Sequence, residues 1–230
     1  MTAAAQAVAD LPQSAEVALA MSDLDLAPDA LAACSELLDT QERIRAASFR
    51  FARHRNRYVA RRGQLRMLLA AEVDCRPAAL TIAQDAYGRP FLPDHPALHF
   101  NLSHSNGRAL FAIGHGVRVG CDLEWRNPEL ACPKVAARLF APAECVALDA
   151  LPPEQWLAGF YNCWTRKEAF VKAIGLGLSY PLDAFTVSVA PGEPARLIEG
   201  GAGWSLTSFE PAPGFQAALV RGEAGRSSAA

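Results

Sequence analysis

The sequence lacks the features that place a chain in a membrane or in the secretory pathway. No apolar run approaches the ~20 residues that cross a bilayer. The first fourteen residues are rich in alanine, but they have no basic start and contain Asp10 and Pro12, which is unlike a secretory signal. We therefore expect a cytoplasmic protein with no membrane partner, in which residues 1–14 and 222–230 form disordered tails.

The six cysteines lack the spacing of a zinc or redox site. No pair has the Cys-x-x-Cys arrangement, and several cysteines lie in apolar stretches. Reduced and mostly buried thiols are the simplest interpretation. With 230 residues, of which 51% are hydrophobic and 20% charged, the chain can form one large domain or two small ones with a core.

Acidic residues are missing from the segment 43–66, which contains nine arginines. The formal net charge of the chain is only −2, so the remaining residues are strongly acidic. Arginines clustered on a helix are typical of a site for phosphate or another polyanion, although a solvated helix face would explain them equally well. Nucleic acid is a weaker interpretation, because the rest of the chain is acidic and has no glycine-rich, basic-aromatic surface. We expect no nucleic-acid partner.

Hydrophobic periodicity predicts a mixture of helices and strands. Asn106-Gly107 between two apolar runs is a strong hairpin signal. The residues 100–103 and 106–110 are echoed by 204–207 and 214–219, which a duplicated helix-plus-sheet half would explain, although such an echo also arises by chance. The predicted strands are 16–21, 80–84, 99–105, 109–113, 117–125, 185–189, 204–210 and 215–220; the predicted helices are 30–38, 42–72, 133–140, one from 141 and 155–174.

Three carboxylates occupy positions that favour a metal site. In the strand 117–125 the period of two places Asp122 and Glu124 on one face. Glu168 follows Trp164 by one turn in the apolar stripe of the helix 155–174. Ordinary solvent charges, or a surface pair of Glu168 with Lys172, are the alternatives. Exposure of that helix face would expose aromatic residues as well, so we favour three carboxylates around a hard divalent cation, most simply Mg²⁺.

Other polar residues near these carboxylates could act on a phosphate. Lys167 and Lys172 flank Glu168, and lysines beside a metal-bound phosphate neutralise charge on a leaving oxygen. A surface position is the alternative, especially for Lys167. His104 lies at the mouth of the predicted hairpin, where a structural and a functional role are equally good interpretations. The turn Gly88-Arg89-Pro90 supplies one cation and means little alone.

Four segments together resemble the 4′-phosphopantetheinyl transferase superfamily, in its larger, surfactin-synthetase-activating type. They lie in the family's order and spacing between residues 87 and 178. Cys121 departs from the aliphatic residue usual there, and the basic helix matches poorly, so that an alignment can select Arg57, Arg61 or Arg62; we favour Arg62 and Arg61. The segments are Tyr87-Gly88-Arg89-Pro90, Phe100-Asn101-Leu102-Ser103-His104-Ser105, Gly120-Cys121-Asp122-Leu123-Glu124 and the stretch from Trp164 to Leu178.

The resemblance implies an α+β fold of two pseudo-symmetric α/β halves, each a small antiparallel sheet packed on a long helix. The active site would lie at their interface in a monomer. Residues 15–115 would form the N-terminal half, which contacts the nucleotide of coenzyme A. Residues 116–221 would form the C-terminal half, which supplies the metal ligands and the base.

The resemblance also implies an activity and its residues. A serine of an acyl or peptidyl carrier protein attacks coenzyme A, receives 4′-phosphopantetheine and releases adenosine 3′,5′-bisphosphate. A non-catalytic coenzyme A-binding protein and a metal-dependent diphosphate hydrolase are the alternatives. The implied Mg²⁺ ligands are Asp122, Glu124 and Glu168, the catalytic residues are Glu168 as base with Lys172 and His104, and the coenzyme A contacts are Arg61, Arg62, Gly88, Arg89, Pro90, Ser103, His104, Lys167 and Lys172.

Overall fold

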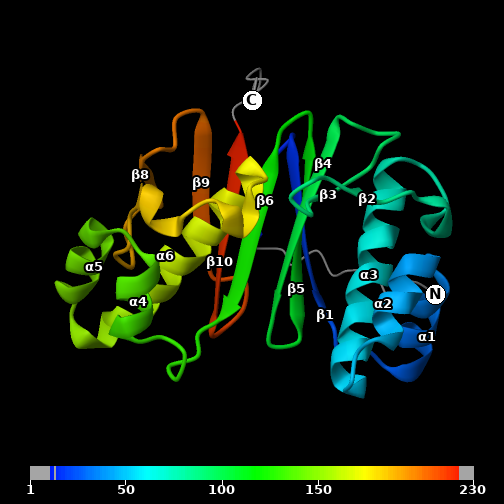
Figure 1. Ribbon diagram of the computed structural model, residues 1–230, viewed down its shortest axis with the longest axis horizontal. Helices are drawn as coiled ribbons and strands as arrows, with labels where there is room; N and C mark the ends of the chain where they lie inside the picture. The colour runs from blue at the N-terminus through cyan, green and yellow to red at the C-terminus, as the bar shows by residue number, and fades with distance from the viewer. Residues whose placement is uncertain (1–10, 13, 223–230) are drawn as a thin grey trace.

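The computed structural model describes residues 11–12 and 14–222, and it consists of two halves with the same order of elements (Figure 1). The N-terminal half contains β1 (Val17–Asp23), α1 (Pro28–Glu36), α2 (Thr40–Ala47), α3 (Ala52–Glu72), β2 (Ala83–Gln84), β3 (Pro90–Phe91), β4 (Leu98–Ser105) and β5 (Arg108–His115). The C-terminal half contains β6 (Val119–Trp125), α4 (Pro133–Leu139), α5 (Pro142–Asp149), α6 (Pro153–Ile174), β7 (Thr186–Val187), β8 (Leu197–Glu199), β9 (Trp204–Phe209) and β10 (Phe215–Gly222).

The two main sheets confirm the predicted duplication. Their strand orders are β1-β5-β4 and β6-β10-β9, and all their neighbouring strands are antiparallel. In each sheet the last strand in the sequence is central, and in each half a long helix, α3 or α6, follows the first strand. The predicted α+β fold, with a small antiparallel sheet on a long helix in each half, is confirmed.

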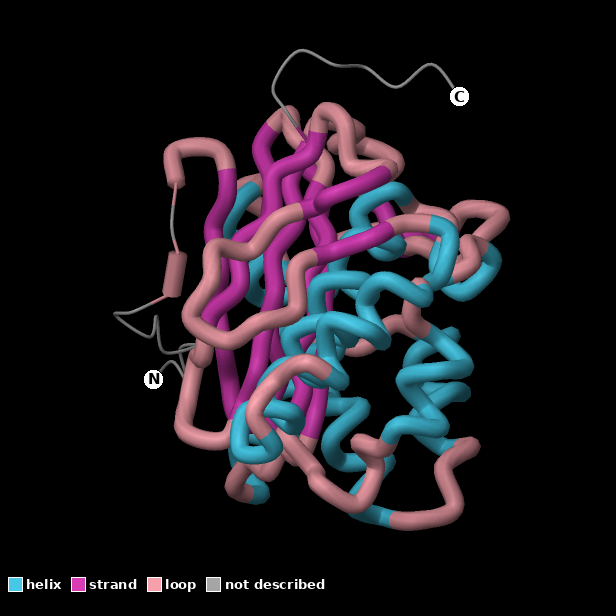
Figure 2. The backbone as a smooth tube through the Cα atoms, turned by 90° about the vertical axis from the view of Figure 1, so that its left-hand side faces the viewer, coloured by secondary structure: helices cyan, strands magenta, loops and turns pink. Residues whose placement is uncertain are grey.

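The elements stack as helix, sheet, sheet and helix, with a core in each of the three gaps. Leu65 and Leu69 of α3 pack on the first sheet, and Phe160 and Phe170 of α6 lie in the core of the second. The strands of the two sheets run side by side in Figure 2. The core between the sheets is formed by residues that alternate along the strands, among them Val17, Leu19, Val119, Cys121, Leu123, Ala217 and Leu219.

The predicted hairpin is confirmed, because β4 and β5 are joined by the two residues Asn106 and Gly107 with φ of 41° and 81°.

The predicted helix 42–72 was wrong as one element. It is two helices, separated at residues 48–51. Asp39 begins α2 through a capping box with Glu42, and Ser48 ends that helix.

Three further expectations needed correction. The strand predicted at 80–84 is reduced to Ala83–Gln84, and the strand predicted at 185–189 to Thr186–Val187. Leu11, assigned to a disordered tail, is buried in the core between the sheets, and Gly222 belongs to β10. Residues 1–10, 13 and 223–230 of the two predicted tails lie outside the described residues. All six cysteines are free, and Cys34, Cys121 and Cys163 are buried.

Candidate active site

Strands β4 and β6 lie side by side at the seam between the two halves, and alternate residues of β4 bind the polar residues of β6. The Asn101 amide oxygen accepts a hydrogen bond from the backbone N–H of Cys121 (2.9 Å). The Ser103 hydroxyl donates to Asp122 Oδ1 (2.7 Å), and the Ser105 hydroxyl donates to Glu124 Oε2 (2.8 Å). The predicted face of Asp122 and Glu124 is therefore turned toward the opposite half and away from bulk solvent.

Helix α6 approaches β6 closely at Gly120. A Cβ atom at this position would lie 2.2 Å from the carbonyl oxygen of Ala169 and 2.3 Å from the backbone nitrogen of Ala173, so a side chain would push the helix away. This contact places the end of α6 against the carboxylates. Lys172 Nζ lies 2.6 Å from Asp122 Oδ1 and donates to the Ser103 hydroxyl at 3.2 Å.

The charges at this junction perturb one another. Burial and then the Asp122 carboxylate raise the pKa of Glu124 to about 7. Burial also raises the pKa of Glu168, opposed by the nearby Lys172 and assisted by Asp122. Although burial acts to lower the pKa of Lys172, the attraction of Asp122 outweighs it and the pKa is raised. Asp122, Glu124, Glu168 and Lys172 thus form one electrostatic cluster, which we call the carboxylate cluster.

The carboxylate cluster has one feature that suits a cation. Asp122 is 2% exposed, and its Oδ2 atom has no hydrogen-bond partner among the described residues. An orphaned buried carboxylate oxygen is costly unless a cation or water binds it. No three histidine, cysteine or acidic side chains within residues 11–12 and 14–222 are arranged as a metal site, and Lys172 is the cation that contacts Asp122. The residues fit Mg²⁺ chemically, but its binding stays a prediction.

A cavity of about 740 Å³ opens beside the carboxylate cluster and extends along α2 and α3. Its basic side chains come mainly from the N-terminal half, and Lys172 closes it on the side of α6. This volume is typical of a site for a small molecule or cofactor. The lining residues include Arg45, Tyr58, Arg61, Arg62, Ile82, Gln84, Pro90, Leu102, Ser103 and His104.

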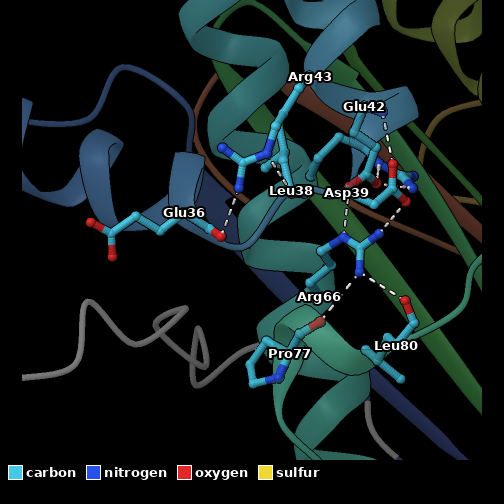
Figure 3. Close-up of polar contacts among 9 residues, drawn as sticks. Glu36, Leu38, Asp39, Glu42, Arg43, Arg66, Pro77 and Leu80 are labelled. Atoms are coloured by element: carbon cyan, nitrogen blue, oxygen red, sulfur yellow. Dashed lines mark hydrogen bonds and ion pairs between the residues drawn. The ribbon is translucent and has the colours of Figure 1, made fainter.

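The arginines of α3 differ in what they bind. Arg66 is fully buried; it bonds to Asp39 and Glu42 and to the carbonyl oxygens of Pro77 and Leu80 (Figure 3). Arg62 forms an ion pair with Glu42. Such pairs neutralise these guanidinium groups inside the protein, so they are poorly available to a ligand.

Arg61 is different, because it forms no ion pair with any described residue and its buried Nε has no hydrogen-bond partner. Its guanidinium lies over the ring of Tyr58, 5.5 Å from the centroid. Burial and the neighbouring charge of Arg62 lower the pKa of Arg61 to about 10, so the group stays charged at neutral pH. Of the two arginines favoured by the sequence, Arg61 is the one placed to receive an anion.

His104 lies at the junction of this cavity with a smaller one of about 280 Å³. Desolvation within the concave site, together with the charges of Arg61, Lys172 and Arg57, lowers its pKa to about 4, although the side chain is open to solvent. A neutral imidazole surrounded by cations can donate or accept a hydrogen bond, and an arriving anion would favour its protonation.

The turn 88–90 lies at the rim of the site. Gly88 has φ of 80°, and Asp85 holds the turn by accepting hydrogen bonds from the backbone of Tyr87 and Arg89. Pro90 lines the main cavity, whereas Arg89 pairs with Asp85 (3.1 Å) and lines an adjoining cavity of about 160 Å³. A ligand bound in the main cavity would therefore lie close to the turn, with the charge of Arg89 beside it.

Lys167 does not belong to the site. Its side chain is fully buried on another face of α6, where it pairs with Glu144 (2.8 Å) and donates to the carbonyl oxygens of Leu182 and Phe185. The expectation that Lys167 contacts coenzyme A is corrected by this geometry. Sequence reasoning also missed Tyr58 and Ser105, and the alternation of Ser103 and Ser105 along β4 was the available signal for the latter.

Comparisons with known proteins agree with this arrangement. Residues 118–220 match the family model described as the 4′-phosphopantetheinyl transferase superfamily. The chain is 36% identical over 210 residues to 4′-phosphopantetheinyl transferase HetI of Nostoc sp. (strain PCC 7120), covering 90% of this chain and 88% of that protein. The chain belongs to the 4′-phosphopantetheinyl transferase superfamily.

Other members of the 4′-phosphopantetheinyl transferase superfamily match shorter parts. The chain is 30% identical over 157 residues to 4′-phosphopantetheinyl transferase Sfp of Bacillus subtilis (strain 168), covering 67% of this chain and 69% of that protein. A solved holo-(acyl-carrier-protein) synthase from Bacillus anthracis, in complex with CoA (3′,5′-ADP), is 22% identical with a TM-score of 0.38, over 46% of this chain and 96% of that chain. The family predicted from the four segments is confirmed by the family model and by the identity with HetI. None of the described helices combines the length and apolar character needed to cross a bilayer.

Proposed function

We propose that this protein transfers the 4′-phosphopantetheine group of coenzyme A to a serine of an acyl or peptidyl carrier protein. The observation that carries the proposal is the contact of a nucleotide-sized basic cavity with the carboxylate cluster at the seam of the two halves. Membership of the superfamily, with a relative of nearly equal length named as such a transferase, supports the same activity.

The basic side of the cavity suits the nucleotide of coenzyme A. Arg61, held over Tyr58 and free of carboxylate partners among the described residues, would bind the 3′-phosphate. His104 and Ser103 line the same cavity as Arg61, and Ser103 is hydrogen-bonded to Asp122, so these two residues would contact the phosphates. Pro90 and the turn 88–90 would bound the base.

The acidic side of the site suits the diphosphate and the attacking serine. Asp122, Glu124 and Glu168 would hold Mg²⁺, which neutralises the diphosphate when bound. Glu168 would accept the proton of the serine hydroxyl, directly or through water, and burial favours this by raising the pKa of Glu168. The serine oxygen then bonds to the β-phosphorus, and the bond from that phosphorus to the bridging oxygen breaks. Lys172 would stabilise the charge on the departing adenosine 3′,5′-bisphosphate.

Both halves contribute to this site within one chain, which supports a monomer as the active unit. Six free cysteines support a reducing compartment such as the cytoplasm.

The decisive measurement is incubation of the protein with coenzyme A, Mg²⁺ and purified apo-carrier proteins, followed by mass spectrometry. We expect each accepted carrier to gain one phosphopantetheine group on its serine, with one equivalent of adenosine 3′,5′-bisphosphate, and EDTA to stop the reaction. Release of free phosphopantetheine without a carrier would instead identify a diphosphate hydrolase. Tight binding of coenzyme A with neither product would identify a binding protein.

The role of Arg61 has its own test. Arg61→Met removes the charge that faces the 3′-phosphate, so affinity for coenzyme A is expected to fall about tenfold to a hundredfold, as for a charge-assisted hydrogen bond worth ~1.5–3 kcal/mol. Affinity for dephospho-coenzyme A, which lacks that phosphate, should be unchanged. Calorimetric titration of both ligands checks this, with the exposed Arg76→Met as the matched control. Equal losses for both ligands would remove Arg61 from the 3′-phosphate site.

A further inference from the structure

Five arginines at the turn from α2 into α3 face solvent, and four of them lie outside both cavities to which His104 belongs. Arg43, Arg45, Arg50, Arg53 and Arg55 are all exposed, whereas Arg57, Arg61, Arg62 and Arg66 of the same basic segment are turned inward. We call residues 43–55 the basic corner. Arg45 also reaches the main cavity, whereas Arg43, Arg50, Arg53 and Arg55 line neither that cavity nor the smaller one.

The positive charge of the basic corner is largely uncompensated. The segment contains no acidic residue, and among described residues Arg45, Arg50, Arg53 and Arg55 form no ion pair. The nearby Asp25 carboxylate is already engaged by Arg57, whose Nε lies 2.6 Å from Asp25 Oδ1. Exposed arginines without acidic partners add little to the stability of the fold, so their concentration here indicates an anionic partner.

The basic corner also exposes two large apolar side chains. Ile44 is 60% exposed and Phe51 is 58% exposed, and the Arg50 guanidinium lies 5.3 Å from the centroid of the Phe51 ring. Apolar and aromatic side chains among arginines are typical of protein interfaces. A nucleic-acid backbone would gain little from Ile44, so the composition favours an acidic protein surface.

The smaller cavity of about 280 Å³ connects the basic corner with the carboxylate cluster. Its lining includes Phe49 and His54, which lie within the basic corner, and also His104 and Ser105 of β4. The Ser105 hydroxyl is hydrogen-bonded to Glu124. A protein docked on the basic corner would thus have a short, partly polar route by which a side chain or prosthetic arm reaches the reacting groups.

We propose that the basic corner is the docking surface for the carrier protein, which would present an acidic face around a small apolar patch. The proposal rests on the transferase function and adds the place where the second substrate binds. Charges at the rim of an interface act mainly on the encounter of the partners, so they should affect the carrier and not coenzyme A.

The test compares two double variants. The corner pair is Arg50→Glu/Arg55→Glu, and the control pair is Arg76→Glu/Arg138→Glu, which makes the same change of charge at exposed positions elsewhere. For the corner pair we expect KM for the carrier to rise at least about tenfold, with kcat and the Kd for coenzyme A unchanged and a weaker dependence on salt. The control pair should behave like the wild type. An unchanged KM in the corner pair, or an equal rise in both pairs, would overturn the docking site.

Two further measurements separate the possible failures. If the wild type transfers nothing to any carrier, the proposed function fails before docking is tested; if it transfers normally and the corner pair does too, only docking fails. Phe51→Ser keeps every charge, and we expect it to raise KM for the carrier severalfold without lowering the melting temperature. Tight binding of a DNA or RNA oligonucleotide that is lost in the corner pair would show that the surface serves nucleic acid instead.

Discussion

Two lysines of α6, five residues apart, form ion pairs that serve different purposes. Lys167 and Glu144 are both fully buried, and every oxygen of Glu144 is used: it accepts hydrogen bonds from the backbone N–H groups of Ala141 and Val187 as well as the lysine. The pair joins α5, α6 and β7 into one unit.

The pair of Lys172 and Asp122 lacks this completeness. The side chain of Lys172 is 25% exposed, Asp122 Oδ2 has no partner in the part of the chain that the structure describes, and two further carboxylates lie nearby. A buried ion pair whose hydrogen-bonding atoms are all satisfied stabilises one structure. An incomplete pair leaves a desolvated polar atom unsatisfied, and a ligand that binds this atom gains binding free energy. The comparison separates the part of α6 that stabilises the fold, at Lys167, from the part that belongs to the candidate site, at Lys172.

The largest effect should come from the incomplete cluster. Glu168→Gln keeps the shape of the side chain but cannot accept a proton, so we expect kcat to fall by a factor of ~10²–10⁴, the usual contribution of a general base. The free energy of unfolding should not fall, because burial, assisted by Asp122, disfavours the Glu168 carboxylate more than Lys172 stabilises it. Carrier modification by mass spectrometry and urea denaturation measure the two quantities.

The matched control for this variant is Glu154→Gln, which removes an exposed carboxylate from the first turn of the same helix. It should retain wild-type kcat. Wild-type turnover in Glu168→Gln would exclude Glu168 as the base.

Breaking the complete pair of Lys167 and Glu144 should lower the stability of the fold and leave the site intact. Lys167→Met leaves Glu144 buried and charged without its cation, and we expect a loss of ~3–5 kcal/mol in the free energy of unfolding. The molecules that remain folded should retain the Kd of the wild type for coenzyme A, because the site is untouched. Urea denaturation and calorimetry check both statements.

Lys167→Met/Glu144→Gln should recover part of the lost stability, since it removes the stranded charge as well. If Lys167→Met lost coenzyme A binding at full stability, the comparison of the two pairs would be broken.

The sequence indicated that Asp122 and Lys172 belong to one site, but it predicted neither their ion pair nor the complete pair of Lys167 and Glu144. Asp122, Glu124, Glu168 and Lys172 lie in short-range patterns of period two and period 3.6 that indicate which face each residue occupies. Lys167 lies about 140° around α6 from Lys172. Its partner Glu144 on α5 and the packing of α5 against α6 and β7 are not visible in local periodicity. Lys167, next to the predicted metal ligand Glu168, was therefore wrongly assigned to the coenzyme A contacts.

The inner and outer arginines show the same limit. The run of basic residues indicated an anion site, but not that Glu42 and Asp39 would occupy Arg62 and Arg66 and leave Arg61 available. The break between α2 and α3 contains no proline or glycine, so the local sequence did not indicate it. The capping-box pattern of Asp39 and Glu42 was a usable signal for the start of α2.

A smaller effect concerns the competition between Lys172 and a metal ion for Asp122. Because Lys172 is the cation that contacts Asp122, it should compete with Mg²⁺ in the absence of coenzyme A. Lys172→Met is expected to tighten the binding of Mg²⁺ or Mn²⁺ to the ligand-free protein by about tenfold, or ~1.4 kcal/mol. Isothermal titration with the metal alone measures this, and the exposed Lys134→Met is the control. Unchanged affinity in Lys172→Met would mean that the lysine and the metal do not share a position.

The smallest effect is a change in how stability depends on pH. The pKa of Glu124 in the folded protein is raised from 4.5 to about 7, so between these values the folded state holds a proton that the unfolded state releases. The contribution of Glu124 to stability is therefore fully present below pH 4.5 and is lost as pH rises through 7. Glu124→Gln should remove this part of the slope, which urea denaturation in EDTA at several pH values between 5 and 8 can measure. The exposed Glu129→Gln should keep the wild-type slope, and the same slope in Glu124→Gln would show that the carboxylate cluster does not hold Glu124 in its protonated form.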